Sequence, residues 1–214
     1  MPNDHGFRLT SRRLAGVAIA AIAMIAGACS ETSEPSAPVR SAQTSASAMN
    51  QVASTIPNSF LTYGLLRQKP LEEDVVVTKT VSSNGGSIDV PGTDFHLQIP
   101  KGAFDGKTMT FTVRALAGST VAYDFEPHGT VFNVPLKFVQ GLGHTNLKGA
   151  KPAPGWESHL AGAYFPNADM VDPETGLAVV TELLPADIDV TWNGSQISFP
   201  IWHFSGYLVS TGRR

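Results

Sequence analysis

Short runs of β-branched and aromatic residues recur between turn signals from about Ser59 to Arg214, and this pattern constrains the fold more than any other feature. Met109, Phe111 and Val113 alternate with polar or Thr neighbours, as expected of a half-buried strand. About ten short strands in one domain predict an all-β fold, an antiparallel β-sandwich. The runs are Asp74–Val81, Ser87–Val90, Phe95–Ile99, Met109–Ala115, Thr120–Phe125, Val134–Val139, Ala161–Phe165, Ala178–Leu183, Ile188–Trp192, Gln196–Phe199 and His203–Ser210.

The first 28 residues have the order of a secretory signal peptide. Arg8, Arg12 and Arg13 precede Leu14–Ala28, which is 15 residues long and carries no charge. A membrane-spanning helix needs about 20 apolar residues, so the segment is too short for a confident span and has the length of a secretory apolar region. The sequence therefore predicts a signal peptide over residues 1–28.

The only cysteine of the chain, Cys29, follows this segment directly, after the small residues Ala26, Gly27 and Ala28. The arrangement resembles the lipobox of bacterial lipoproteins, although Ala26 stands where that family prefers Leu. The resemblance implies that Cys29 becomes the new N-terminus and carries lipid chains that anchor the protein to a membrane. Ser30 after the cysteine implies the outer membrane of the bacterial cell envelope. An ordinary signal peptide beside a chance cysteine, or an uncleaved anchor, are the alternatives.

Composition separates a tether from a folded domain. In the stretch from Ser30 to Ile56, 17 of 27 residues are Ser, Thr, Ala or Pro and none is aromatic. Such a segment cannot bury enough apolar surface to offset its chain entropy. We therefore expect a flexible tether over residues 29–58, weakly helical at most near Ser45 to Ala53, and a folded domain over 59–214.

Charge and cysteine content exclude several classes of function. Removing residues 1–28 leaves 12 basic and 17 acidic residues, a net charge of −5, which does not suit a nucleic-acid partner. One cysteine allows neither a disulfide framework nor a cysteine-based zinc site. No HExxH pattern, P-loop or dinucleotide fingerprint occurs, so no metal or cofactor is predicted. Asp169, Asp172 and Glu174 lack the spacing of an EF-hand and read as a solvated turn.

Three stretches resemble the ZU5 domain. Gly85–Val90 and Phe95–Phe104 match a GG turn, a strand and an IP-x-GA motif, and Phe125–Leu136 matches a P-x-G-x-x-F-x-x-P-L segment. Pro100 ends a strand and Gly102 permits a corner, so these motifs define a fold and no catalytic site. The resemblance implies a non-enzymatic protein-interaction module, here with an unknown envelope protein or polysaccharide as partner.

His203-Phe204-Ser205 matches the HFS motif at which some ZU5 domains cut themselves. The resemblance implies cleavage between Phe204 and Ser205 by an N-to-O acyl shift, with Ser205 as nucleophile and His203 as base or orienting group. The other interpretation is a buried terminal strand in which His203 is hydrogen-bonded inside the sandwich. The leading prediction is thus a lipid-anchored binding or structural module, and self-cleavage is the first alternative.

A long irregular stretch, GLGHTNLKGAKPAPGWESH, runs from Gly141 to about His159. Loops of this length are uncommon and often functional, although a plain crossover between two sheets also explains this one. Trp156 lies within the stretch, and an exposed aromatic side chain there would favour a carbohydrate-binding module. This is the third predicted function.

Overall fold

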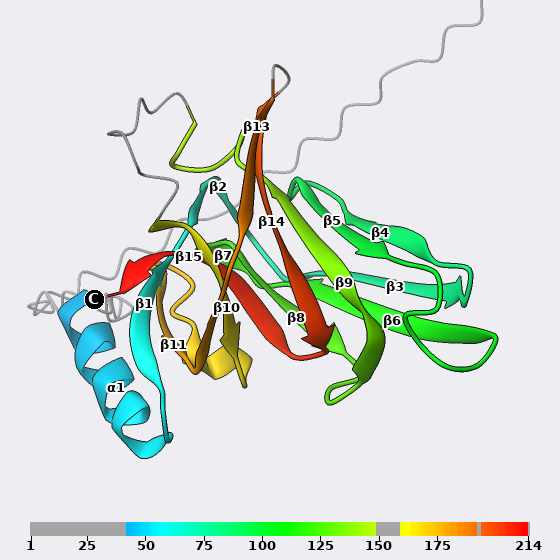
Figure 1. The fold of residues 1–214 in the computed structure, drawn as a ribbon. Coiled ribbons are helices and arrows are strands. Elements are labelled where there is room, and N and C mark those ends of the chain that lie inside the picture. Colours follow the sequence, from blue (N-terminus) through cyan, green and yellow to red (C-terminus); the bar gives the residue numbers. More distant parts are fainter. Residues whose placement is uncertain (1–41, 149–158, 192–193, 214) are drawn as a thin grey trace, which may run out of the picture. The chain divides into compact units, whose positions relative to one another are not determined.

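A computed structural model describes residues 42–148, 159–191 and 194–213. Fifteen strands and one α-helix occupy most of these residues, and all the strand pairings are antiparallel (Figure 1). The predicted all-β sandwich is therefore confirmed. The strand number exceeds the eleven predicted runs because Thr120–Phe125 and Ala178–Leu183 each divide into two strands, and because two strands near residue 65 were not predicted.

An eight-stranded sheet forms one layer of the sandwich. Its main path runs β11-β1-β15-β8-β6-β3, and β10 pairs with both β15 and β12. These strands are β1 (Phe60–Gly64), β3 (Val75–Ser82), β6 (Thr108–Ala115), β8 (Ala122–Glu126), β10 (Ala161–Phe165), β11 (Leu177–Val180), β12 (Glu182–Leu184) and β15 (Gly206–Arg213).

A five-stranded sheet in the order β13-β14-β9-β5-β4 forms the other layer. Its strands are β4 (Gly86–Val90), β5 (Phe95–Ile99), β9 (Val131–Gly141), β13 (Asp187–Thr191) and β14 (Gly194–His203). A separate two-stranded sheet joins β2 (Leu66–Leu71) to β7 (Gly118–Thr120). Strand β2 forms part of the wall of a pocket described below.

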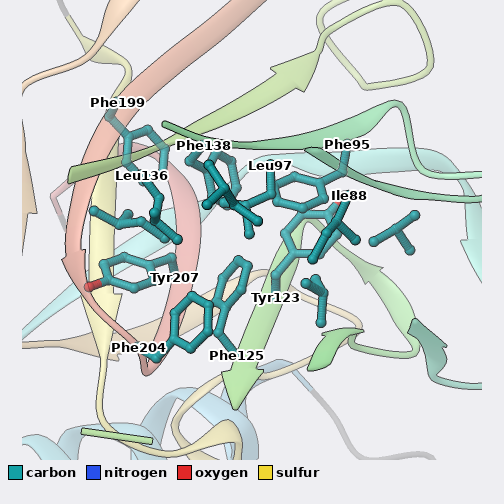
Figure 2. Close-up of a cluster of buried hydrophobic side chains, with 14 of the residues drawn as sticks. Ile88, Phe95, Leu97, Tyr123, Phe125, Leu136, Phe138, Phe199, Phe204 and Tyr207 are labelled. Carbon is teal, nitrogen blue, oxygen red and sulfur yellow. The ribbon is translucent and has the colours of Figure 1, made fainter. Parts of the chain in front are cut away.

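Aromatic rings fill the space between the two sheets (Figure 2). Phe95 of β5 stacks on Tyr123 of β8 with ring centroids 4.2 Å apart, and Phe138 of β9 lies 4.7 Å from Phe95. The rings of Phe95, Tyr123 and Phe138 are all fully buried. Burial of these large apolar surfaces is the main force that holds the two sheets together.

Residues Ala42–Thr55, which the sequence assigned to a flexible tether, form the helix α1. The segment contains alanine, the strongest helix former, and neither Gly nor Pro. It contacts β1 and β11 and belongs to the same compact unit as the sheets (Figure 1). Tertiary contact with these strands thus supplies the stability that so short a polar helix lacks alone.

Candidate functional sites

The HFS motif lies at a corner where the chain passes from one sheet to the other. Strand β14 of the five-stranded sheet ends at His203, and β15 of the eight-stranded sheet begins at Gly206. The predicted continuous strand His203–Ser210 is therefore wrong at its start, because Phe204 and Ser205 lie between two strands. A corner is needed here because the side chains of both sheets must face the same core.

Three backbone hydrogen bonds hold the main chain of Phe204 and Ser205 in place. The Phe204 N–H donates to the carbonyl of Thr130 at 2.8 Å, and the Phe204 carbonyl accepts from Gly129 N–H at 3.0 Å. The Ser205 carbonyl accepts from Phe125 N–H at 3.1 Å. Gly129 has a φ of 74°, a left-handed conformation that glycine adopts without strain.

The side chain of Phe204 belongs to the aromatic core and is 1% exposed (Figure 2). Its ring lies 4.8 Å from that of Phe132, 5.3 Å from that of Phe111 and 5.4 Å from that of Phe125. This packing is sufficient to explain why the middle residue of the motif is aromatic, because the buried ring stabilises the core. Both motifs of the resemblance, the HFS triplet and the Phe125–Leu136 segment, therefore meet at one place in the core.

The imidazole of His203 lies beside two tyrosines. Its ring centroid is 5.1 Å from that of Tyr164, and Nδ1 is 3.3 Å from the hydroxyl of Tyr207. The Tyr207 hydroxyl donates to the His203 carbonyl at 2.8 Å. Ser205 is buried, and among the described residues none forms a hydrogen bond with its hydroxyl. The structure therefore brings the three motif residues to one corner without the hydrogen bond that a His203 base would make to Ser205.

A second histidine near this corner is held by a carboxylate. His128 Nε2 lies 2.9 Å from Asp124 Oδ1, and Arg114 Nη2 lies 2.6 Å from Asp124 Oδ2. The carboxylate of Asp124 is buried, and the ion pair raises the pKa of Arg114 above its ordinary value. This cluster fixes β6, β8 and the turn that carries Gly129 relative to one another.

A pocket of about 610 Å³ lies beside β2, and the sequence analysis did not predict it. Arg67 of β2, which is 8% exposed, forms part of its wall. Leu71, Val75, Thr93 and Thr145 also line the pocket. Arg67 gives no signal in the sequence beyond being one charged residue after Leu65-Leu66, so only the tertiary structure identifies it.

The remaining predicted sites have different outcomes. Cys29 and Trp156 lie outside the described residues. Asp172 Oδ1 accepts the N–H groups of Glu174 and Thr175, and the described residues contain no group of three His, Cys, Asp or Glu placed to hold a metal ion. Within the same residues no helix is long and apolar enough to cross a membrane.

Comparison with protein-family models gives no match to this chain. Comparison with curated protein sequences also gives none. The resemblance to ZU5 domains therefore stays a prediction from motifs.

Proposed function

We propose that this chain is a lipoprotein of the bacterial cell envelope, anchored to the outer membrane through Cys29, whose β-sandwich is a non-enzymatic binding or structural module. The observation that carries the proposal is the position of the only cysteine, directly after a signal-like segment. A thiol there receives the lipid, and two or more acyl chains give stable anchoring.

The geometry of the HFS corner supports a structural role for the motif. Phe204 fills the core, the backbone of the corner is hydrogen-bonded on both sides, and His203 faces Tyr164 and Tyr207. Each of these contacts stabilises the passage between the sheets. The module would use its surface and its pocket to bind an envelope protein or polysaccharide.

Labelling of growing bacteria with radioactive palmitate tests the anchor. We expect the wild-type chain and a Ser30→Ala control to incorporate label, and Cys29→Ala to incorporate none. Label that survives in Cys29→Ala, or an unlabelled wild type, would refute the lipoprotein assignment. Fractionation of the membranes on a density gradient then tests the outer-membrane location.

Self-cleavage is the second candidate, and one contact favours it. The N–H of Gly129 donates to the Phe204 carbonyl, the group that Ser205 would attack, and such a donor stabilises the negative charge of a tetrahedral intermediate. In this step Ser205 Oγ bonds to the Phe204 carbonyl carbon, the C–N bond between Phe204 and Ser205 breaks, and the hydroxyl proton passes to the freed Ser205 nitrogen. Water then hydrolyses the ester to a Phe204 carboxylic acid and the free Ser205 hydroxyl. The mass measurement in the Discussion separates this candidate from the first.

A further inference from the structure

Of the three guanidinium nitrogens of Arg67, only Nη1 has hydrogen-bond acceptors by distance and angle among the described residues. Its Nη1 donates to the carbonyls of Leu116 at 3.2 Å and Gly118 at 3.3 Å, and also to that of Thr120. Nε and Nη2 are buried, and no acceptor among the described residues lies at hydrogen-bond distance and angle to either nitrogen. Arg67 also forms no ion pair with a carboxylate in the described ranges. A buried cation without a counter-ion is costly, so this arrangement calls for a functional explanation.

Two polar side chains near Arg67 are hydrogen-bonded to each other. The guanidinium carbon lies 5.7 Å from the ring centre of Tyr123, whose hydroxyl donates to Gln140 Oε1 at 2.7 Å. Gln140 Nε2 in turn donates to the carbonyls of Thr93 and Gly141. These bonds fix the wall around Arg67.

The two unused nitrogens form one specific edge of the guanidinium. The N–H groups of Nε and Nη2 are parallel, and this edge matches the two oxygens of a carboxylate in a bidentate pair. The Nη1 bonds to β7 and its neighbours hold the group in place, so little side-chain entropy is lost on binding. The guanidinium is thus already held in one orientation, while its Nε and Nη2 edge is closed to solvent.

The pocket beside Arg67 indicates which anion fits. Leu71 and Val75 offer an apolar wall for a short aliphatic chain. Glu72, Glu73 and Asp94 also line the pocket, together with Lys69 and His144. Asp94 is paired with His144. With acidic residues this near, a dianion such as phosphate is repelled more strongly than a single carboxylate.

We propose that this pocket binds a small organic carboxylate, held by the Nε and Nη2 edge of Arg67 with its aliphatic chain against Leu71 and Val75. The inference rests on the proposed binding function and gives that function a ligand class. Because both nitrogens are shielded from solvent, the entering carboxylate displaces part of the pocket wall, and Arg67 itself reports binding.

The test uses the full-length chain, labelled with ¹⁵N and purified in detergent, with butyrate as ligand and butyramide as its uncharged match. The Nε–H resonance of Arg67 is assigned by its loss in Arg67→Lys. We expect butyrate to shift this resonance and to bind about tenfold more tightly than butyramide, as a charged hydrogen-bonded pair requires. Arg67→Lys keeps the positive charge but lacks the two parallel N–H groups, so it should weaken butyrate binding about tenfold.

A second variant protects the test against loss of folding in Arg67→Lys. Leu71→Asp leaves Arg67 intact, adds a negative charge to the wall and should also weaken butyrate binding about tenfold. Equal binding of butyrate and butyramide, or an unmoved Arg67 resonance, would overturn the proposal and assign the edge to buried water. Displacement of butyrate by equimolar inorganic phosphate would overturn the carboxylate preference. None of these results depends on palmitate labelling at Cys29, so the two proposals fail separately.

Discussion

The hydroxyl of Tyr207 donates a hydrogen bond to the backbone carbonyl of His203 at 2.8 Å. Tyr207 belongs to β15 of the eight-stranded sheet, and His203 is the last residue of β14 in the five-stranded sheet. This bond therefore joins the end of one strand to the start of the next strand, in the other sheet. Between them, Phe204 enters the core beside Phe125 (Figure 2). The HFS corner is therefore closed by its own flanking residues, and its mutations should act mainly on stability.

Truncation of Phe204 tests this role. Phe204→Ala removes a ring that is 1% exposed and contacts three other aromatic rings, so the free energy of unfolding should fall by about 3–5 kcal/mol. Trp202→Ala, two residues earlier, removes a ring that is 52% exposed and should cost at most about 1 kcal/mol. Urea unfolding followed by circular dichroism measures both. Equal losses in the two variants would contradict the buried role of Phe204.

Intact-mass measurement tests self-cleavage. We expect the purified chain to remain a single covalent species after prolonged incubation at neutral pH, because no described residue forms a hydrogen bond with the Ser205 hydroxyl. Ser205→Ala should then have the same chain integrity as the wild type. Release of the fragment 205–214 from the wild type, and its loss in Ser205→Ala, would instead establish the self-cleaving alternative.

Gly206 leaves space that Phe165 fills. A Cβ atom at Gly206 would lie 2.0 Å from Cε2 of Phe165, so Gly206→Ala should lower the free energy of unfolding by about 3 kcal/mol or more. Phe165→Leu in the same chain should recover part of this loss, which a double-mutant cycle quantifies. Gly143→Ala, where nothing lies within 4 Å of the new Cβ, serves as the control and should change stability by less than about 1 kcal/mol.

Alkaline pH should destabilise the fold through its buried tyrosines. Burial raises the pKa of Tyr123 and of Tyr207 above the ordinary value of 10.0, so both stay protonated in the folded chain while the unfolded chain loses these protons. Their contribution is complete below pH 10 and declines as the pH rises further. Each buried tyrosine should lower the free energy of unfolding by about 1.4 kcal/mol per pH unit in that range.

Tyr207→Phe should make the decline of the unfolding free energy with pH less steep, by the contribution of one tyrosine. At neutral pH this variant should lower the free energy of unfolding by about 1–2 kcal/mol, because the hydrogen bond to the His203 carbonyl is lost. Unfolding in urea at pH 8, 10 and 11 provides the measurement. Tyr63→Phe, which changes a half-exposed ring, should leave both the slope and the neutral-pH stability unaltered. A wild-type stability that rises above pH 10 would contradict the argument.

Much of the strand content follows from local pattern. Phe95–Ile99 and Ala161–Phe165 are strands with the predicted bounds, because short alternating or apolar runs between turn signals favour the extended conformation. β2 was missed, since LRQKPL lacks that alternation and its neighbours β7 and Thr145 are far away in sequence. The sequence indicated only weak helicity near Ser45 to Ala53, because the stability of α1 depends on its contact with β1 and β11.

The sequence by itself determined the β-rich class of the domain, the position of Cys29 after an apolar segment, and the residues of the HFS motif. Only the tertiary structure decided that this motif is a corner between two sheets, that His203 faces tyrosines, and that Arg67 is buried with one edge unused. The physical reason is that the pattern of apolar and polar residues along the chain encodes which side chains become buried. Hydrogen-bond partners and pockets depend instead on segments that meet only when the chain has folded.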